Sequence, residues 1–258
     1  MKSMIGALIS LALGLICGLV RGMVWEATYD EATQLLTDSA VLNLSHCLVI
    51  VSLLLSMVLM WKRWPRGFAS APPYQGAMPA RLIRILAGAA ALASGLLMVQ
   101  EALGAFVFAL IPLLMALFQT AEGIAMIALA ADQGTTTSRY STLLLIPTFA
   151  SCYWMVAFYH AFGTEPNAET YLYPILTGLA VMAAWIFYAG FTFKPGEGRQ
   201  FAVCALAVLV LAPSALAAPM SLPYRLSLMA QLVWFFMAYV SLEPEPPSVS
   251  NGETPPHI

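Results

Sequence analysis

The sequence carries very little charge. Lys, Arg, Asp and Glu make up 9% of its 258 residues, whereas hydrophobic residues make up 60%. A soluble domain needs about 25% charged residues to cover its surface, so this chain is expected to fold in lipid. The same composition excludes disordered chains, coiled coils, collagen and disulfide-stapled secreted domains. A formal net charge of −2 gives no electrostatic basis for binding nucleic acid.

The motifs of membrane enzymes and cofactor sites are missing as well. No apolar run contains the lysine that a retinal Schiff base needs, and Ala93-Ser94-Gly95 lacks the first glycine of a rhomboid-type serine motif. Paired intramembrane aspartates, a prenyl-protease Glu-Glu pair, HExxH, a P-loop and a dinucleotide fingerprint are absent. We therefore expect neither an enzyme nor a cofactor. The cysteines stand singly, without CxxC spacing, and are expected to be reduced apolar fillers rather than metal ligands: Cys17, Cys47, Cys152 and Cys204.

Long apolar runs are what the sequence has in abundance. A bilayer core of about 30 Å requires about 20 helical residues. Eight runs approach this length, at residues 4–24, 41–61, 82–100, 103–130, 141–162, 171–193, 201–218 and 223–240. The prediction is an all-α polytopic transmembrane helical bundle over residues 1–242. The proline- and glutamate-rich segment 243–258 is expected to be a disordered cytoplasmic tail.

The basic residues predict the orientation of the bundle. With a cytoplasmic N-terminus, only Arg21 and Arg225 of the eleven basic residues fall on the outer side. Cytoplasmic loops of membrane proteins carry an excess of Lys and Arg. Both termini are therefore expected in the cytoplasm, and the protein in the plasma membrane. The remaining basic residues would all lie on the inner side: Lys2, Lys62, Arg63, Arg66, Arg81, Arg84, Arg139, Lys194 and Arg199.

Glu122 is the clearest ionisable residue at membrane depth. It falls just inward of the middle of the fourth run, with Gln119 one helical turn before it and Gly123 beside it. A charged group there costs at least about 2.5–3.5 kcal/mol, so its presence needs a reason. Gln119 and Glu122 share a face that must point into the bundle. One hypothesis is that Glu122 couples proton or ion movement to transport, with Gln119 as a ligand contact; the other is a neutral Glu that only holds helices together.

A second polar group is expected near the outer face. His46 of the second run, Glu101 after the third and His160 at the end of the fifth would all lie a turn or two from the outer surface. Together they would form a titrating cluster or a weak metal site. The competing interpretation is that water and backbone satisfy each histidine singly. No HxxxH or HxxE spacing supports a metal.

Small residues, prolines and tryptophans predict how the helices pack. Gly14-x-x-x-Gly18 and the small residues from Ala87 to Gly95 allow helices to approach closely. The tryptophans near mid-span are expected to pack inside the bundle or to line a ligand pocket: Trp154, Trp185 and Trp234. Prolines inside three runs are expected to kink them: Pro112, Pro147 and Pro213.

The two halves of the chain share an order of runs and loops. Each half has a long run, an acidic outer loop, a second run and a basic inner connection, which is the pattern of a 4+4 parallel repeat. The loop from Lys62 to Ala80 (residues 62–80) is the longest inner connection and carries four prolines, which forbid a continuous helix. It is interpreted as a connector that follows the membrane surface, or alternatively as a docking surface for a protein partner.

Three segments resemble uncharacterised multi-pass membrane proteins of anaerobic Gram-positive bacteria: Tyr29-Asp30-Glu31-Ala32-Thr33-Gln34-Leu35, Pro166 to Tyr173, and Tyr188-Ala189-Gly190-Phe191. The resemblance covers about a third of the chain. Because that family has no assigned activity, the resemblance implies a multi-pass membrane protein and transfers no site residues.

Two functions remain open on the sequence alone. The first is a small secondary transporter or ion-coupled permease in which Glu122 and Gln119 bind the coupling ion or substrate. The second is a non-catalytic membrane subunit or sensor that binds partner proteins through loop 62–80 and the tail.

Overall fold

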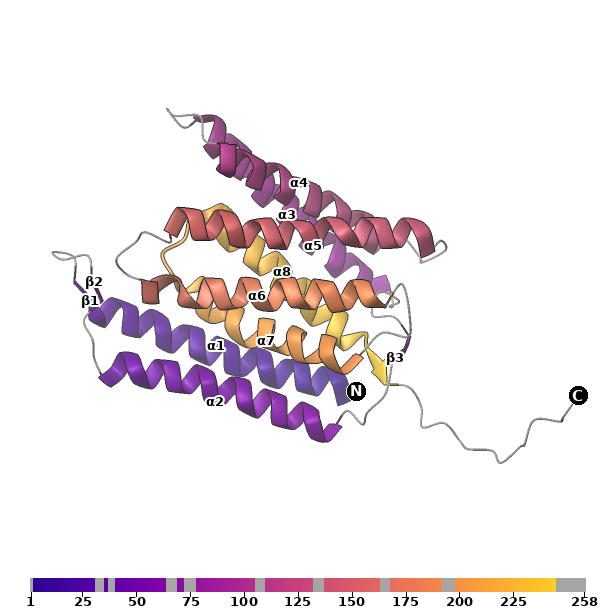
Figure 1. Ribbon diagram of the computed structural model, residues 1–258. Helices are drawn as coiled ribbons and strands as arrows, with labels where there is room; N and C mark the ends of the chain where they lie inside the picture. The colour runs from indigo at the N-terminus through magenta and orange to yellow at the C-terminus, as the bar shows by residue number, and fades with distance from the viewer. Residues whose placement is uncertain are drawn as a thin grey trace, which may run out of the picture.

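The computed structural model describes residues 2–30, 35–36, 40–63, 69–71, 78–104, 110–131, 137–162, 168–191 and 198–244. These residues form eight α-helices, each overlapping one of the predicted runs, so the all-α bundle is confirmed (Figure 1). The helices are α1 (Lys2–Thr28), α2 (Ala40–Arg63), α3 (Met78–Gly104), α4 (Leu110–Ala131), α5 (Thr137–Phe162), α6 (Ala168–Gly190), α7 (Gly198–Leu216) and α8 (Leu222–Val240).

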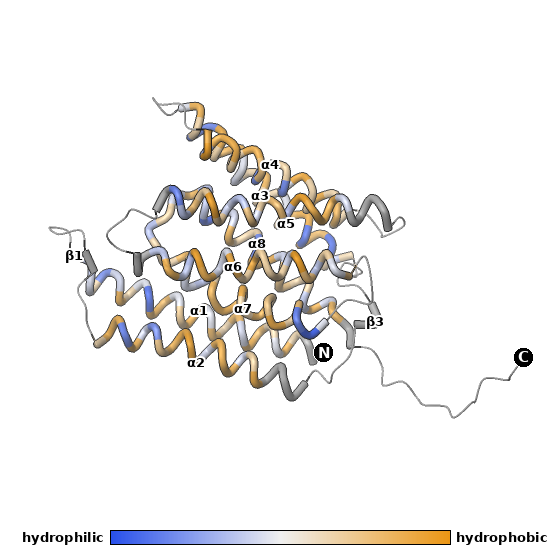
Figure 2. The backbone as a smooth tube through the Cα atoms, in the orientation of Figure 1, coloured by the Kyte–Doolittle hydropathy of each residue, from blue (hydrophilic) through white to orange (hydrophobic). Residues whose placement is uncertain are grey.

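The helices identify an integral membrane protein. Seven of them, α1 to α7, are long and apolar enough to cross a bilayer. The eighth, α8, has 19 residues but is less apolar, because it includes Arg225 and Gln231. Most of the tube in Figure 2 is coloured as hydrophobic, on outward-facing helices as well as inside. Large apolar side chains such as Leu19 and Met23 are 70% and 72% exposed, a surface that suits lipid and not water.

Helix α7 lies inside the bundle, packed on α1, α2, α6 and α8. The approach of α1 depends on glycine. A Cβ atom at Gly14 would lie 2.3 Å from the carbonyl oxygen of Leu209, and one at Gly18 would lie 2.6 Å from that of Pro213. The close contact predicted from Gly14-x-x-x-Gly18 is confirmed, and α7 is the helix that it meets.

Helices α3 and α4 form a second close pair, which is tilted against α5 and α6 in Figure 1. A Cβ atom at Gly95 would lie 2.5 Å from the backbone nitrogen of Thr120, and one at Gly123 would lie 2.3 Å from that of Leu92. Ala91 is completely buried. The small-residue face of α3 therefore packs against α4 as predicted, and Gly123 admits the α3 backbone directly beside Glu122.

The turn between α3 and α4 lies later than predicted. Helix α3 continues through Glu101 to Gly104, and α4 begins at Leu110 rather than at Leu103. Pro112 thus lies in the first turn of α4, where a proline fits because its fixed φ suits the turn and its missing N–H is not needed. The predicted kink at Pro112 inside a span was therefore wrong. Pro147 and Pro213 do lie within their helices.

The helix contacts do not support a 4+4 parallel repeat. Such a repeat would pack α2 on α3 as α6 packs on α7. Helix α6 does pack on α7, but α2 lies against α1 and α7, whereas α3 lies against α4 and α8.

Short strands join some of the helix ends. Strands β1 (Tyr29–Asp30) and β2 (Leu35–Leu36) pair in antiparallel fashion after α1. Strand β3 (Ala69–Ala71), within loop 62–80, pairs with β4 (Glu243–Pro244) at the start of the predicted tail. Residues 64–68 and 72–77 of that loop and 245–258 of the tail lie outside the described residues, so partner docking and tail disorder stay predictions.

Candidate functional site

Glu122 lies on α4 with its side chain inside the bundle. It is 2% exposed, and Gln119, one turn earlier on the same helix, is 1% exposed. The predicted inward face of α4 is therefore present. Close packing at Gly123 holds this part of α4 against α3, so the carboxyl group has a fixed backbone beneath it.

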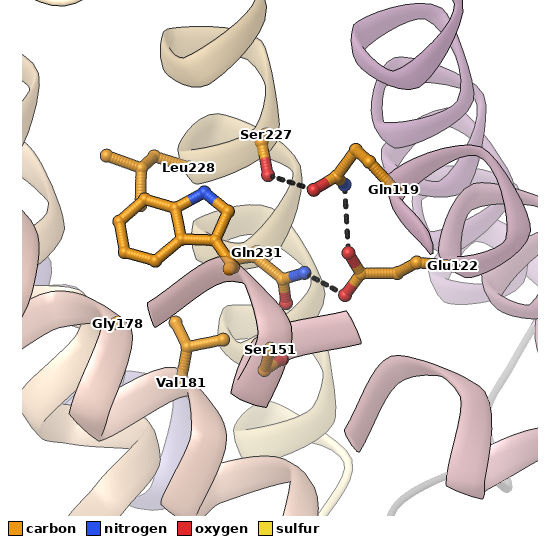
Figure 3. A pocket seen from close by; sticks show the side chains of 9 residues that line it. Gln119, Glu122, Ser151, Gly178, Val181, Ser227, Leu228 and Gln231 are labelled. Carbon is orange, nitrogen blue, oxygen red and sulfur yellow. Dashed lines mark hydrogen bonds between the residues drawn. The ribbon is translucent and has the colours of Figure 1, made fainter. Parts of the chain in front are cut away.

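Two amide groups donate hydrogen bonds to the Glu122 carboxyl group (Figure 3). Gln119 Nε2 donates to Glu122 Oε2 over 2.8 Å. Gln231 Nε2, from α8, donates to Glu122 Oε1 over 2.5 Å. Each carboxyl oxygen thus has its own N–H donor, one from α4 and one from α8, as suits the ionised carboxylate.

The oxygen atoms of both amides are also bonded. Ser227 Oγ on α8 donates to Gln119 Oε1 over 3.1 Å. Trp185 Nε1 on α6 donates to Gln231 Oε1 over 2.9 Å. The five side chains form one continuous hydrogen-bonded chain across α4, α6 and α8, and Trp185 and Gln119 are buried along with Glu122.

A small cavity adjoins this chain. Its volume is about 20 Å³. On the same scale one water molecule requires roughly 10–15 Å³, so the cavity is large enough for one. Trp154 lines it, and the indole Nε1 of Trp154 is a buried donor without a hydrogen-bond partner. Of the described residues that line the cavity, Glu122 alone has an ionisable side chain; they are Gln119, Glu122, Ser151, Trp154, Gly178, Val181, Ser227, Leu228 and Gln231.

The arrangement can bind a proton or a small ion. A carboxylate inside an apolar bundle is costly unless it is paired or neutralised, and no cationic side chain lines this cavity. Two N–H donors stabilise its charge in part, and the water-sized space beside it leaves room for a bound water molecule or small ion. The site therefore has the parts of a reversible ion-binding group.

The structure places the outer polar residues apart from this site. His46 is partly buried, and its Nδ1 lies 2.7 Å from the hydroxyl oxygen of Tyr173 on α6. The guanidinium carbon of the buried Arg21 lies 4.4 Å from the centre of the same Tyr173 ring. Glu101 on α3 and His160 in the last turn of α5 are exposed. Within the part of the chain that the structure describes, no three His, Cys, Asp or Glu side chains are arranged to hold a metal ion.

Sequence reasoning found Glu122 and Gln119 but missed three partners on α6 and α8. Trp185 was expected only to pack or to line a pocket, and Gln231 and Ser227 were not singled out. One signal was available, because Ser227 and Gln231 are four residues apart and so share a face of a helix that is otherwise mostly apolar.

No protein-family model, curated protein or solved structure matches the chain. The resemblance to multi-pass proteins of anaerobic Gram-positive bacteria therefore stays a prediction, and the function has to be argued from the site itself.

Proposed function

We propose that the protein is a small secondary transporter or ion-coupled permease in which Glu122 is the coupling group. One observation carries the proposal. A buried carboxyl group lies beside a cavity, with N–H donors from two helices and no cationic side chain in the cavity lining. If Glu122 only held helices together, a neutral amide in its place would serve equally well and would avoid the cost of a carboxylate in lipid.

The proposal assigns Glu122 to proton binding and Gln119, Ser227 and Gln231 to the walls of the ion site. A proton or cation binds because it neutralises the buried carboxylate of Glu122. The only covalent bond that forms or breaks is the O–H bond of the protonated carboxyl group. The protein is placed in the plasma membrane with both termini cytoplasmic. The placement of basic residues at alternate ends of the helices supports this orientation.

Proton movement in lipid vesicles tests the proposal. The purified protein is reconstituted with a pH-sensitive dye inside, and solutes of defined classes are added outside in turn: amino acids, sugars, organic acids, organic cations and alkali-metal ions. At least one class is expected to change the internal pH with the wild-type protein. The Glu122→Gln variant is expected to abolish that change while remaining folded.

Glu101→Gln is the matched control, because it makes the same substitution at an exposed glutamate on another helix. It is expected to behave like the wild type. Proton movement that survives in Glu122→Gln would show that the coupling role is wrong. If no solute class moves protons, transport itself is wrong for these classes, and the sensor or subunit hypothesis gains weight.

A further inference from the structure

The side-chain amides of Gln119 and Gln231, which both bond to Glu122, differ in whether they can rotate so that their oxygen and nitrogen atoms exchange places. The oxygen of Gln231 accepts from the indole N–H of Trp185, and an indole nitrogen can only donate. Reversing the Gln231 amide would set its NH₂ group against that N–H. The oxygen of Gln119 accepts instead from the hydroxyl of Ser227, and a hydroxyl can either donate or accept. Gln231 is therefore held in one orientation, whereas Gln119 has two.

Protonation of Glu122 changes the hydrogen-bond partners that its carboxyl group needs. The ionised form only accepts, and both N–H donors suit it. The neutral form carries an O–H donor, which needs an acceptor. With both amides in their present orientation, the two groups nearest the carboxyl oxygens offer it N–H alone. An unpaired buried donor is costly, so the neutral state favours turning one amide.

We propose that the Gln119 amide reverses when Glu122 takes up a proton, while Trp185 holds Gln231 in place. The proton binds to Glu122 Oε2, and the new O–H donates to Gln119 Oε1. Gln119 Nε2 then donates to Ser227 Oγ, which changes from donor to acceptor. Loss of the proton reverses each step, and no other bond is made or broken. Trp185 and Ser227 are thus positioning residues that act on the carboxyl group through the two amides.

Among the described residues that line the cavity, none apart from Glu122 carries a charge. Helix α5 presents Ser151 and Trp154, α6 presents Gly178 and Val181, and α8 presents Ser227, Leu228 and Gln231. Helix α3 meets α4 beside Glu122 through the backbone of Leu92. Its buried Arg84 lies near the far end of the helix and donates to Met237 O and Ser241 Oγ. The protonation state of Glu122 is therefore passed on through hydrogen bonds rather than through ion pairs.

The consequence reaches α8. Because Ser227 gives up its donor role to Gln119 in the neutral state, its hydroxyl hydrogen must turn to another acceptor. A proton bound on α4 thereby alters the hydrogen bonding of α8 without changing the charge of any α8 side chain. This inference rests on the proposed function, since it takes Glu122 to be a group that gains and loses a proton.

Infrared spectroscopy of the full-length protein in lipid tests the reversal. The carbonyl band of a protonated carboxyl group is followed against pH, and the part due to Glu122 is identified by its loss in Glu122→Gln. Gln119→Met and Gln231→Met each remove one N–H donor to the same carboxyl group. If Gln119 reverses, its loss also deprives the neutral form of its acceptor, so the titration midpoint should move little. Gln231→Met weakens mainly the ionised form and should move the midpoint upward by about one to two pH units.

Trp185→Phe provides a second test that leaves both amides in place. Without the indole N–H, Gln231 can also turn, but the single O–H of the neutral form already has its acceptor in the reversed Gln119, so the midpoint should move little. Equal shifts in Gln119→Met and Gln231→Met, or an upward shift of about one pH unit or more in Trp185→Phe, would overturn the reversal while leaving a titrating Glu122. A Glu122 band that never titrates would overturn the proposed function itself.

Discussion

At Gln231 a single amide group serves two partners. Its nitrogen donates to Glu122 and its oxygen accepts from Trp185. Gln231→Leu would leave the indole N–H of Trp185 and the Oε1 atom of Glu122 buried without these hydrogen bonds, so we expect a loss of about 1–3 kcal/mol of stability. Thermal unfolding of the purified protein in detergent measures this loss.

Gln100→Leu is the control, because Gln100 is an exposed glutamine on α3. It is expected to change stability by less than about 0.5 kcal/mol. Equal unfolding temperatures for the two variants would mean that the bonds of Gln231 do not form in the folded protein.

The sequence predicts some residues of the site and not others, for a physical reason. Glu122 stands out because a carboxyl group in an apolar run is costly wherever the helix lies, and Gln119 follows from helical spacing. A neutral amide such as Gln231 carries a smaller cost and attracts less notice. Its role depends on α8 lying beside α4, and the 108 residues that separate Gln231 from Glu122 in the sequence carry no local pattern that predicts that contact.

At the scale of helices, the contact between α1 and α7 depends on the missing side chains of its glycines. Gly14→Leu would place a side chain against the backbone at Leu209, where even a Cβ atom would lie 2.3 Å from the carbonyl oxygen. The helices must separate, at an expected cost of about 1–3 kcal/mol or more. The midpoint of thermal unfolding in detergent should fall accordingly.

Gly22→Leu makes the same change two turns later on α1, where nothing lies within 4 Å of the added Cβ atom. This variant is expected to unfold like the wild type. Leucine favours a helix more than glycine does, so an equally large loss at Gly22 would show that any leucine added to α1 destabilises the protein, whether or not it meets α7.

Helix positions were predictable from the length of the apolar runs, but one boundary was not. The segment after Gln100 contains Glu101, which suggested a turn, yet α3 continues to Gly104. A single acidic residue near a helix end costs little when its side chain is exposed, as that of Glu101 is. The proline at position 112 was the better signal, because prolines favour the first turn of a helix.

At the scale of the whole molecule, the number of helices that cross the membrane decides whether the two termini lie on the same side. Of the described helices, seven are long and apolar enough to span, and α8 is less apolar because it carries the buried Ser227 and Gln231 and the exposed Arg225. If α8 also crosses, both termini lie on one side of the membrane. If it does not, they lie on opposite sides.

Reporter fusions after Ile258 decide between these arrangements. We expect a green fluorescent protein fused there to fluoresce and an alkaline phosphatase fused there to be inactive, since the account places the C-terminus in the cytoplasm. An active phosphatase fusion would mean that α8 does not cross or that the bundle is inverted. A second pair of fusions after Ala131, on the loop that follows α4, separates these two outcomes because that loop is also expected in the cytoplasm.

The central claim is that Glu122 gains and loses a proton inside the bundle. The most direct measurement is the infrared carbonyl band of protonated carboxyl groups, recorded in lipid at high and low pH for the wild-type protein and for Glu122→Gln. The account predicts a buried carboxyl band that grows as the pH falls in the wild type and is missing in the variant. A difference spectrum between the two pH values that is the same for both proteins would contradict it, and would leave Glu122 with a structural role alone.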